Sequence, residues 1–169
     1  MTSFQPWRAH QPSNSSDDLL RELHRQNRLP ADAIWIRQVP VSFELAPVRV
    51  ISAIHQHRPD SIICCGMAEN RPFLSIEQWA KGPGQPLQTS VELSALLTGT
   101  WLSEISNDAG TYVCNHLYYS VLNFISHAGL DIPALFIHVP VLSCANQTLI
   151  LNDFEHVVFK MAKLSIHPL

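Results

Sequence analysis

The stretch SIICCG at residues 61–66 is a continuous run of small and apolar residues that ends in a glycine. A run of this kind, without regular polar alternation, is typical of a strand buried on both faces of a parallel sheet. A second such run, ALFIHV at residues 134–139, ends before Pro140. These two stretches predict the centre of a sheet that is covered by helices on both sides.

Helical patterns lie on either side of these strands in the chain. Residues 14–28 begin with a capping side chain and acids and end with basic residues, which predicts a first helix. Pro47 suits the first position of a second helix, which ends before Pro59. Apolar residues at helical spacing predict three more helices, at residues 91–97, 114–128 and 147–164.

Shorter β-rich segments complete the alternation, at residues 34–39, 73–79 and 101–106. Alternating strands and helices favour an α/β fold with a mainly parallel sheet. We therefore expect a three-layer α/β/α sandwich, formed by one domain over residues 1–169, because this length fits a single domain.

The composition excludes several classes of protein. The chain is 46% hydrophobic and 15% charged, with a net charge of −3 and no block of like charge. Binding of nucleic acid or of an anionic membrane through a basic surface is therefore not expected. No apolar run approaches the ~18 residues of a membrane span, and the first residues lack the apolar core of a secretory signal. We expect a cytoplasmic protein with reduced cysteines.

Three polar residues lie at positions that suit catalysis. Cys114 falls where an irregular segment becomes a helix, so the N–H groups and dipole there would lower its thiol pKa from ~8.5 and could hold an oxyanion. His138 is near the end of a buried strand, where α/β sheets bind ligands, and could act as base and then as acid. Glu77 follows the end of the 61–66 strand, on the same expected edge, and could orient the imidazole.

General physics leaves a structural alternative open for each of the three. A cysteine in an apolar helix is more often inert packing, and a lone histidine in a strand is more often structural. A lone glutamate is usually solvated. The other cysteines, Cys64, Cys65 and Cys144, have no metal-ligand spacing and are interpreted as buried or incidental thiols.

At these residues the sequence resembles the pyroglutamyl peptidases, the cysteine peptidase family C15. GTYVCNH at residues 110–116 looks like their nucleophile motif, and FIHVP at residues 136–140 looks like their histidine motif. The glutamate segment is matched more distantly by GMAENR and IEQWA, at residues 66–71 and 76–80. Two further stretches agree, at residues 2–7 and 39–43, so the resemblance extends from Thr2 to about Ala162.

The resemblance implies a Glu77–His138–Cys114 triad that removes N-terminal pyroglutamate from peptides through an acyl-enzyme, with no metal or organic cofactor. It also implies a substrate pocket made by Phe4, Trp7, Asn14, Met67, Tyr112 and Val113. For Phe4 and Trp7 the alternative is hydrophobic anchoring of the chain terminus.

The sequence departs from the family at three places. The chain begins where the family has a complete strand before the matching threonine, so we expect a sheet that lacks the family's first strand. Met67 replaces a polar residue, and Glu69 and Asn70 replace a glycine pair. A long loop after the glutamate is replaced by residues 81–89, which predicts an altered substrate side.

These departures keep two further hypotheses open: an amidase for another small acyl group, and a binding homologue without activity. Apolar residues of the final helix (Phe154, Val157 and Met161) could serve a homo-oligomer, although their helical spacing is more often ordinary core.

Overall fold

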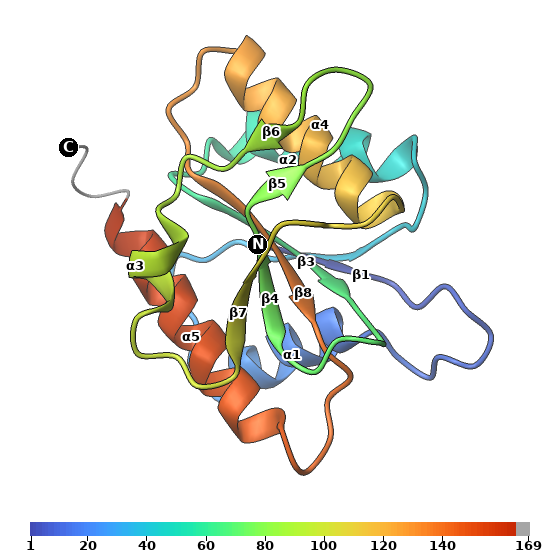
Figure 1. Cartoon of the computed structure of the whole chain (residues 1–169), viewed down its shortest axis with the longest axis vertical. Coiled ribbons are helices and arrows are strands. Elements are labelled where there is room, and N and C mark those ends of the chain that lie inside the picture. The colour runs from blue at the N-terminus through green and yellow to red at the C-terminus, as the bar shows by residue number, and fades with distance from the viewer. Residues whose placement is uncertain (165–169) are drawn as a thin grey trace.

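A six-stranded sheet forms the centre of the computed structural model, which describes residues 1–164 (Figure 1). Its strands are β1 Thr2–Phe4, β2 Ile36–Val39, β3 Ile62–Met67, β4 Leu74–Glu77, β7 Ser103–Ser106 and β8 Ala134–Val139. Their order is β2-β1-β3-β8-β4-β7, and all neighbours are parallel except the antiparallel pair β8 and β4. The predicted α/β fold with a mainly parallel sheet is confirmed.

The two apolar runs of the sequence are adjacent strands at the centre of this sheet. β3 and β8 pair in parallel along their full lengths, from Ile62 opposite Ala134 to Met67 opposite Val139. Every residue of β8 is buried, as a strand covered on both faces requires. A separate two-stranded hairpin, β5 Trp79–Ala80 and β6 Leu87–Gln88, follows β4.

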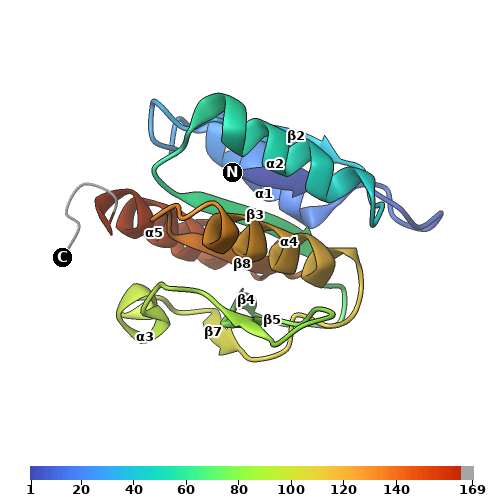
Figure 2. The same ribbon diagram turned by 90° about the horizontal axis from the view of Figure 1, so that it is seen from above.

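Helices cover both faces of the sheet. They are α1 Ser15–Arg25, α2 Leu45–His57, α3 Leu93–Leu97, α4 Val113–His127 and α5 Gln147–Leu164. α2 and α4 pack together on one side, and α1 and α5 lie on the other (Figures 1 and 2). No helix in the described part of the chain is long and apolar enough to cross a membrane.

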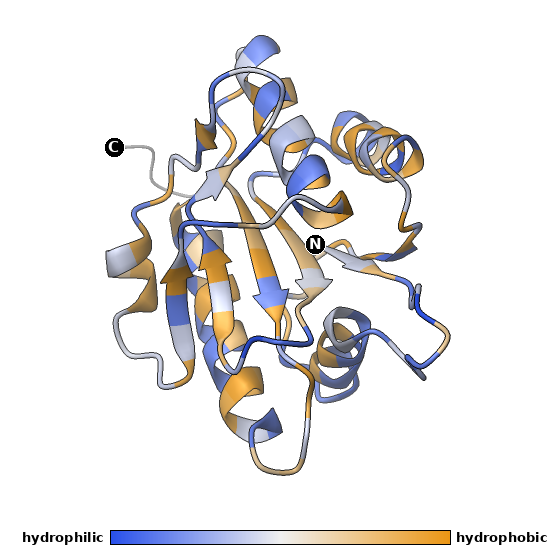
Figure 3. Ribbon diagram, turned by 45° about the vertical axis from the view of Figure 1, so that its right-hand side comes forward, coloured by the Kyte–Doolittle hydropathy of each residue, from blue (hydrophilic) through white to orange (hydrophobic). Residues whose placement is uncertain are grey.

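Alternation along each strand divides the core into two clusters. In β3, Ile63 and Cys65 join the core beneath α1 and α5, whereas Ile62 and Cys64 join the core beneath α2 and α4. Apolar residues, orange in Figure 3, are concentrated on these central strands. The same alternation in β8 and β4 directs His138 and Glu77 to the α4 side of the sheet, because Ile137 and Ile76 belong to the opposite core.

Two helix predictions are confirmed closely. α5 has the predicted bounds, and Phe154, Val157 and Met161 are fully buried in it, which confirms their interpretation as ordinary core. α4 ends at the predicted place, because Gly129 adopts a φ of +62° directly after the Ala128 cap.

Two predictions at other elements need correction or comment. The second helix begins at Leu45, so Pro47 is its third residue; the N–H groups of the whole first turn lack helical partners, and proline is tolerated there. Thr2–Phe4 forms a short strand between β2 and β3. The absence of a first strand of the family stays a prediction.

We expect Asp153→Ala to lower the free energy of unfolding by about 2–4 kcal/mol, because hydrogen bonds to a buried charge are strong. Asp153 is buried on α5 and accepts from the N–H groups of Trp101 and Leu102 and from the hydroxyl of Ser103 at 2.6–3.0 Å, which fixes the start of β7. Urea unfolding measures the change. Exposed Asp32 provides the control, since Asp32→Ala should change stability by less than about 0.5 kcal/mol; equal effects of the two variants would contradict the prediction.

Candidate active site

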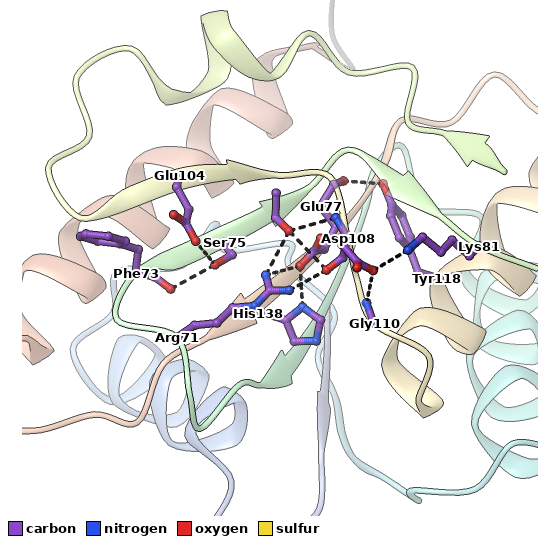
Figure 4. Close-up of polar contacts among 11 residues, drawn as sticks. Arg71, Phe73, Ser75, Glu77, Lys81, Glu104, Asp108, Gly110, Tyr118 and His138 are labelled. Carbon is purple, nitrogen blue, oxygen red and sulfur yellow. Dashed lines mark hydrogen bonds and ion pairs between the residues drawn. The ribbon is translucent and has the colours of Figure 1, made fainter.

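Glu77 and His138 form a buried hydrogen-bonded pair on the α4 side of the sheet. Nδ1 of His138 lies 2.7 Å from Oε1 of Glu77, and the two residues are 6% and 0% exposed (Figure 4). The antiparallel register places Ser75 opposite His138 and Glu77 opposite Phe136. A carboxylate accepts the proton of Nδ1, which leaves the lone pair of the neutral ring on Nε2.

Glu77 lies in a β-strand, as predicted for residues 73–79, but the direction of that strand was not predicted. It closes β4, two places from β3 in the sheet. The contact with His138 arises because β4 runs antiparallel to β8 and brings Glu77 alongside it.

Arg71 is a second partner of the Glu77 carboxylate. Nη1 of Arg71 donates to Oε1 of Glu77 at 2.6 Å, while Oε2 of Glu77 is buried without a hydrogen-bond partner. Burial by itself raises the pKa of Glu77, but the hydrogen bond and charge of His138, with the charge of Arg71, outweigh it and hold the pKa below its usual value. Glu77 is therefore a carboxylate at neutral pH.

The thiol of Cys114 lies close to this pair. Cys114 is the second residue of α4, and a Cβ at Gly66 would lie only 2.7 Å from its Sγ. Gly66 pairs with His138 in the β3–β8 register, so the sulfur lies over the strand next to the imidazole. A glycine at residue 66 is therefore what allows the sulfur to approach the sheet so closely.

The predicted lowering of the Cys114 pKa is wrong for the unliganded structure. Burial of the thiol, together with the negative charge of Glu77, raises its pKa to about 12. The helix N-terminus is present as predicted, but desolvation and a nearby carboxylate outweigh it here. The ground state of Cys114 is thus a neutral thiol.

Cys114 and His138 both line a pocket of about 390 Å³. Phe4 and Trp7 from the N-terminal segment also line it, and the ring centroids of Trp7 and Tyr112 lie 4.8 Å apart at its exposed side. Volumes of this size suit small ligands. The pocket therefore combines a thiol, an imidazole and aromatic walls.

The other predicted pocket residues differ in what they offer. Asn14 and Met67 line the pocket, but Asn14 also caps α1 through the N–H of Ser16. The sulfur of Met67 accepts from the N–H of Ser15 at 3.4 Å. Val113 is buried in the core beneath α4 and does not line the pocket, unlike Tyr112, which does.

Several residues at the mouth of the pocket were not predicted from the sequence. Glu69, noted only as a replacement of a glycine, accepts from Arg8, His10 and Gln11 at 2.8–3.0 Å and so ties the N-terminal loop to the segment after β3. Arg8 and Gln11 carry no sequence signal, because their partner is far along the chain. Arg71 stood inside a motif segment, but its contact with Glu77 was not predicted.

Within residues 1–164, no group of three or more His, Cys, Asp or Glu side chains is arranged to hold a metal ion. A thiol, an imidazole and a buried carboxylate beside one pocket are the types of side chain from which cysteine hydrolases build their catalytic sites.

Comparisons with known proteins identify the family. The pyrrolidone-carboxylate peptidase of Thermoanaerobacter sp. (strain X514) is 32% identical over 168 residues, which cover 84% of this chain and 81% of that protein. A pyrrolidone-carboxylate peptidase of Caldanaerobacter subterraneus subsp. tengcongensis is 31% identical over the same shares. The family model described as pyroglutamyl peptidase matches residues 95–157. The chain belongs to the pyroglutamyl peptidase family.

Crystal structures agree on the fold. Pyroglutamyl peptidase I of Bacillus amyloliquefaciens superposes with a TM-score of 0.82 at 22% identity, covering 97% of this chain and 96% of that one. The pyrrolidone carboxyl peptidase of Thermococcus litoralis gives a TM-score of 0.79 at 19% identity, over 96% and 92% of the two chains.

Proposed function

We propose that residues 1–169 form one cysteine peptidase domain that removes N-terminal pyroglutamate from peptides, with Cys114 as nucleophile, His138 as base and acid, and Glu77 as the group that orients His138. The observation that carries the proposal is the 2.7 Å contact between Glu77 and Nδ1 of His138 beside the pocket that also holds Cys114. The relatives are named pyrrolidone-carboxylate peptidases, which supports the choice of substrate. A cytoplasmic location stays a prediction.

The reaction proceeds in two halves. Nε2 of His138 takes the proton of the Cys114 thiol as the sulfur attacks the pyroglutamyl carbonyl carbon, and N–H groups at the start of α4 stabilise the oxyanion. The tetrahedral intermediate collapses with cleavage of the C–N bond, and protonated His138 gives its proton to the leaving amine. His138 then deprotonates a water molecule, which attacks the thioester. Collapse of this second intermediate releases pyroglutamate, and protonated His138 returns the proton to the sulfur of Cys114. Carboxylate Glu77 stabilises the imidazolium in both halves.

The walls of the pocket suit a small uncharged lactam. Phe4 is almost fully buried and forms an apolar wall, and the Trp7–Tyr112 pair supplies flat aromatic surface on the exposed side. Tyr112 and Val113 stand at the start of α4, where the N–H groups of the first turn have no helical partners, and we propose that these groups meet the ring carbonyl. We propose Asn14 and Met67 as further contacts of the ring.

One observation favours a second function, an amidase for a different acyl group. Met67 offers the ring no hydrogen-bond donor, and its sulfur already accepts from Ser15. A donor to the lactam carbonyl would thus have to come from the main chain or from another side chain of the pocket, such as Asn14.

The test is a panel of fluorogenic amides that share one leaving group: pyroglutamyl, prolyl and N-acetylalanyl. We expect the pyroglutamyl amide to have the highest kcat/KM, because prolyl lacks the ring carbonyl and acetylalanyl lacks the ring. Preference for acetylalanyl would support the amidase instead. A chain that turns over none of the three, while its far- and near-ultraviolet circular dichroism shows it folded, would sink both proposals and leave the binding homologue.

A further inference from the structure

The guanidinium of Arg71 joins the buried carboxylate to the wall of the pocket. Nη1 donates to Oε1 of Glu77 at 2.6 Å and to Oγ of Ser106 at 3.2 Å, and Nη2 donates to the main-chain oxygen of Asp108 at 2.6 Å. Figure 4 shows the side chain reaching from the segment after β3 toward Glu77 and Asp108. One planar fork thus bridges β4 and the segment that follows β7.

The segment held by Arg71 leads directly to the thiol. Asp108 accepts through Oδ1 from the N–H of Gly110 at 3.0 Å and from Nζ of Lys81 at 2.9 Å. The next residues, Ala109 to Thr111, line the pocket, and α4 with Cys114 begins immediately after them. The position of this wall therefore depends on what holds Asp108.

A second contact fixes the same region from the other side. The side chain of Asn115, the neighbour of Cys114, makes two hydrogen bonds with the main chain of Lys81, at 2.7 and 2.8 Å. The ion pair of Lys81 with Asp108 is largely exposed and so contributes little. Arg71 is three-quarters buried, which makes its contact with the Asp108 carbonyl the stronger restraint on the wall.

We propose that Arg71 is a positioning residue of the reaction, which fixes Glu77 against His138 and holds the 106–110 segment as the wall in front of Cys114. The inference rests on the proposed peptidase function. Arg71 touches neither the sulfur nor the imidazole, and acts through Glu77 and through the main chain of Asp108.

The positive charge of Arg71 and the planar guanidinium that hydrogen-bonds Glu77 and Asp108 at once (the fork) have separable effects. Arg71 and His138 share the single oxygen Oε1, so the guanidinium neutralises part of the charge that stabilises the imidazolium. Its charge also favours the Cys114 thiolate. Removing the cation therefore raises the pKa of the Cys114 thiol. Other charged or titratable groups around the site include Cys64, Tyr112, Tyr118, Lys81 with Asp108, and Arg8 with Glu69 and His10.

Two substitutions separate these effects. Arg71→Met removes charge and fork, and we expect kcat/KM to fall by about 10- to 100-fold, the equivalent of a lost charged hydrogen bond. Its pH profile should move up by about one unit. Arg71→Lys keeps the charge but cannot reach Glu77 and Asp108 at once, so its pH profile should match the wild type while KM rises.

Arg49→Met is the matched control, because Arg49 also donates to main-chain carbonyls, those of Arg37 and Gln38, but on the exposed surface beside α2. It should leave kcat/KM and the pH profile unchanged. A loop that is merely loosened lowers activity without moving the profile, so an unshifted profile in Arg71→Met overturns the inference. A wild-type KM in Arg71→Lys overturns the role assigned to the fork.

The pH dependence of iodoacetamide reaction at Cys114, followed by peptide mass spectrometry, gives a readout that needs no turnover. Arg71→Met should raise the apparent pKa of this reaction, and Arg71→Lys should not. If the wild-type chain hydrolyses no pyroglutamyl amide, the proposed function fails while this readout still decides the coupling of Arg71 to the thiol. If the wild-type chain is active and the alkylation profiles of all variants coincide, the inference on Arg71 fails alone.

Discussion

Cys114→Ala is expected to lower hydrolysis of a pyroglutamyl amide by about 10⁴-fold or more, since loss of a nucleophile leaves only binding and oxyanion stabilisation. The thiol lies over Gly66, in the same pocket as His138, and no other cysteine lines that pocket. The fold should persist, because removal of one half-buried sulfur usually changes stability by only about 1 kcal/mol. Steady-state kinetics with the fluorogenic amide measures the loss.

Cys144→Ala is the matched control for this substitution. Cys144 is exposed and lies outside the pocket, so its replacement should leave kcat/KM unchanged. Urea unfolding of both variants checks that neither has lost its fold. Retention of more than a few per cent of wild-type kcat/KM in Cys114→Ala would exclude an acyl-enzyme on this sulfur.

The raised pKa of Cys114 makes the reactivity of its thiol depend on pH. Because burial and Glu77 favour the neutral thiol, the folded protein should react with iodoacetamide slowly at pH 7 and faster with each rise in pH up to about pH 9. A thiolate paired with imidazolium would instead give a fast reaction that is nearly constant from about pH 6 to 9. In the proposed mechanism a neutral thiol means that the proton leaves during attack, not before it.

The sequence predicted most of the elements that local patterns define. Residues 61–66 and 134–139 became β3 and β8 because their composition suits strands buried on both faces. The start of α1 was predictable from Asn14 and the end of α4 from Gly129. A capping side chain and a glycine with positive φ both act within one helical turn.

The sequence could not predict the pairing that brings the site together. Nothing in residues 74–77 distinguishes a strand that runs parallel to its neighbour from one that runs antiparallel, yet the antiparallel pairing places Glu77 alongside His138. The contacts of Arg71 with Ser106 and Asp108 likewise join segments that are separated in the chain by β4, the β5–β6 hairpin and α3. Such contacts depend on sheet order, which is a property of the whole chain.

The pKa of Cys114 also could not be predicted from local sequence. The helix N-terminus that favours a thiolate is visible in the sequence, since it is a local feature. Desolvation of the sulfur and its distance from Glu77 depend on how α4 packs on β3, and these two effects prevail.

The stability of the protein is expected to fall steeply above about pH 9, where unfolded thiols ionise, because three cysteines have raised pKa values in the fold. Burial raises the pKa of Cys64 to about 11 and that of Cys114 to about 12, and raises that of Cys65 further. A raised folded pKa favours the protonated native state. The stabilisation is therefore fully present below the unfolded pKa of ~8.5 and is lost as the pH rises through the folded values.

Each such thiol lowers the free energy of unfolding by about 1.4 kcal/mol for every pH unit above ~8.5, so three thiols cost about 6 kcal/mol at pH 10. An ordinary domain has only about 5–15 kcal/mol in total. Urea unfolding at pH 7.5, 9 and 10 under reducing conditions measures the slope.

Cys65→Ala should reduce the slope above pH 9 by about one third, and Cys144→Ala, an exposed position, should not change it. Slopes are compared in place of absolute stabilities, because the cavity left by Cys65→Ala lowers stability equally at every pH. Identical slopes in the wild type and Cys65→Ala would show that this thiol is already ionised, or exposed, in the native state.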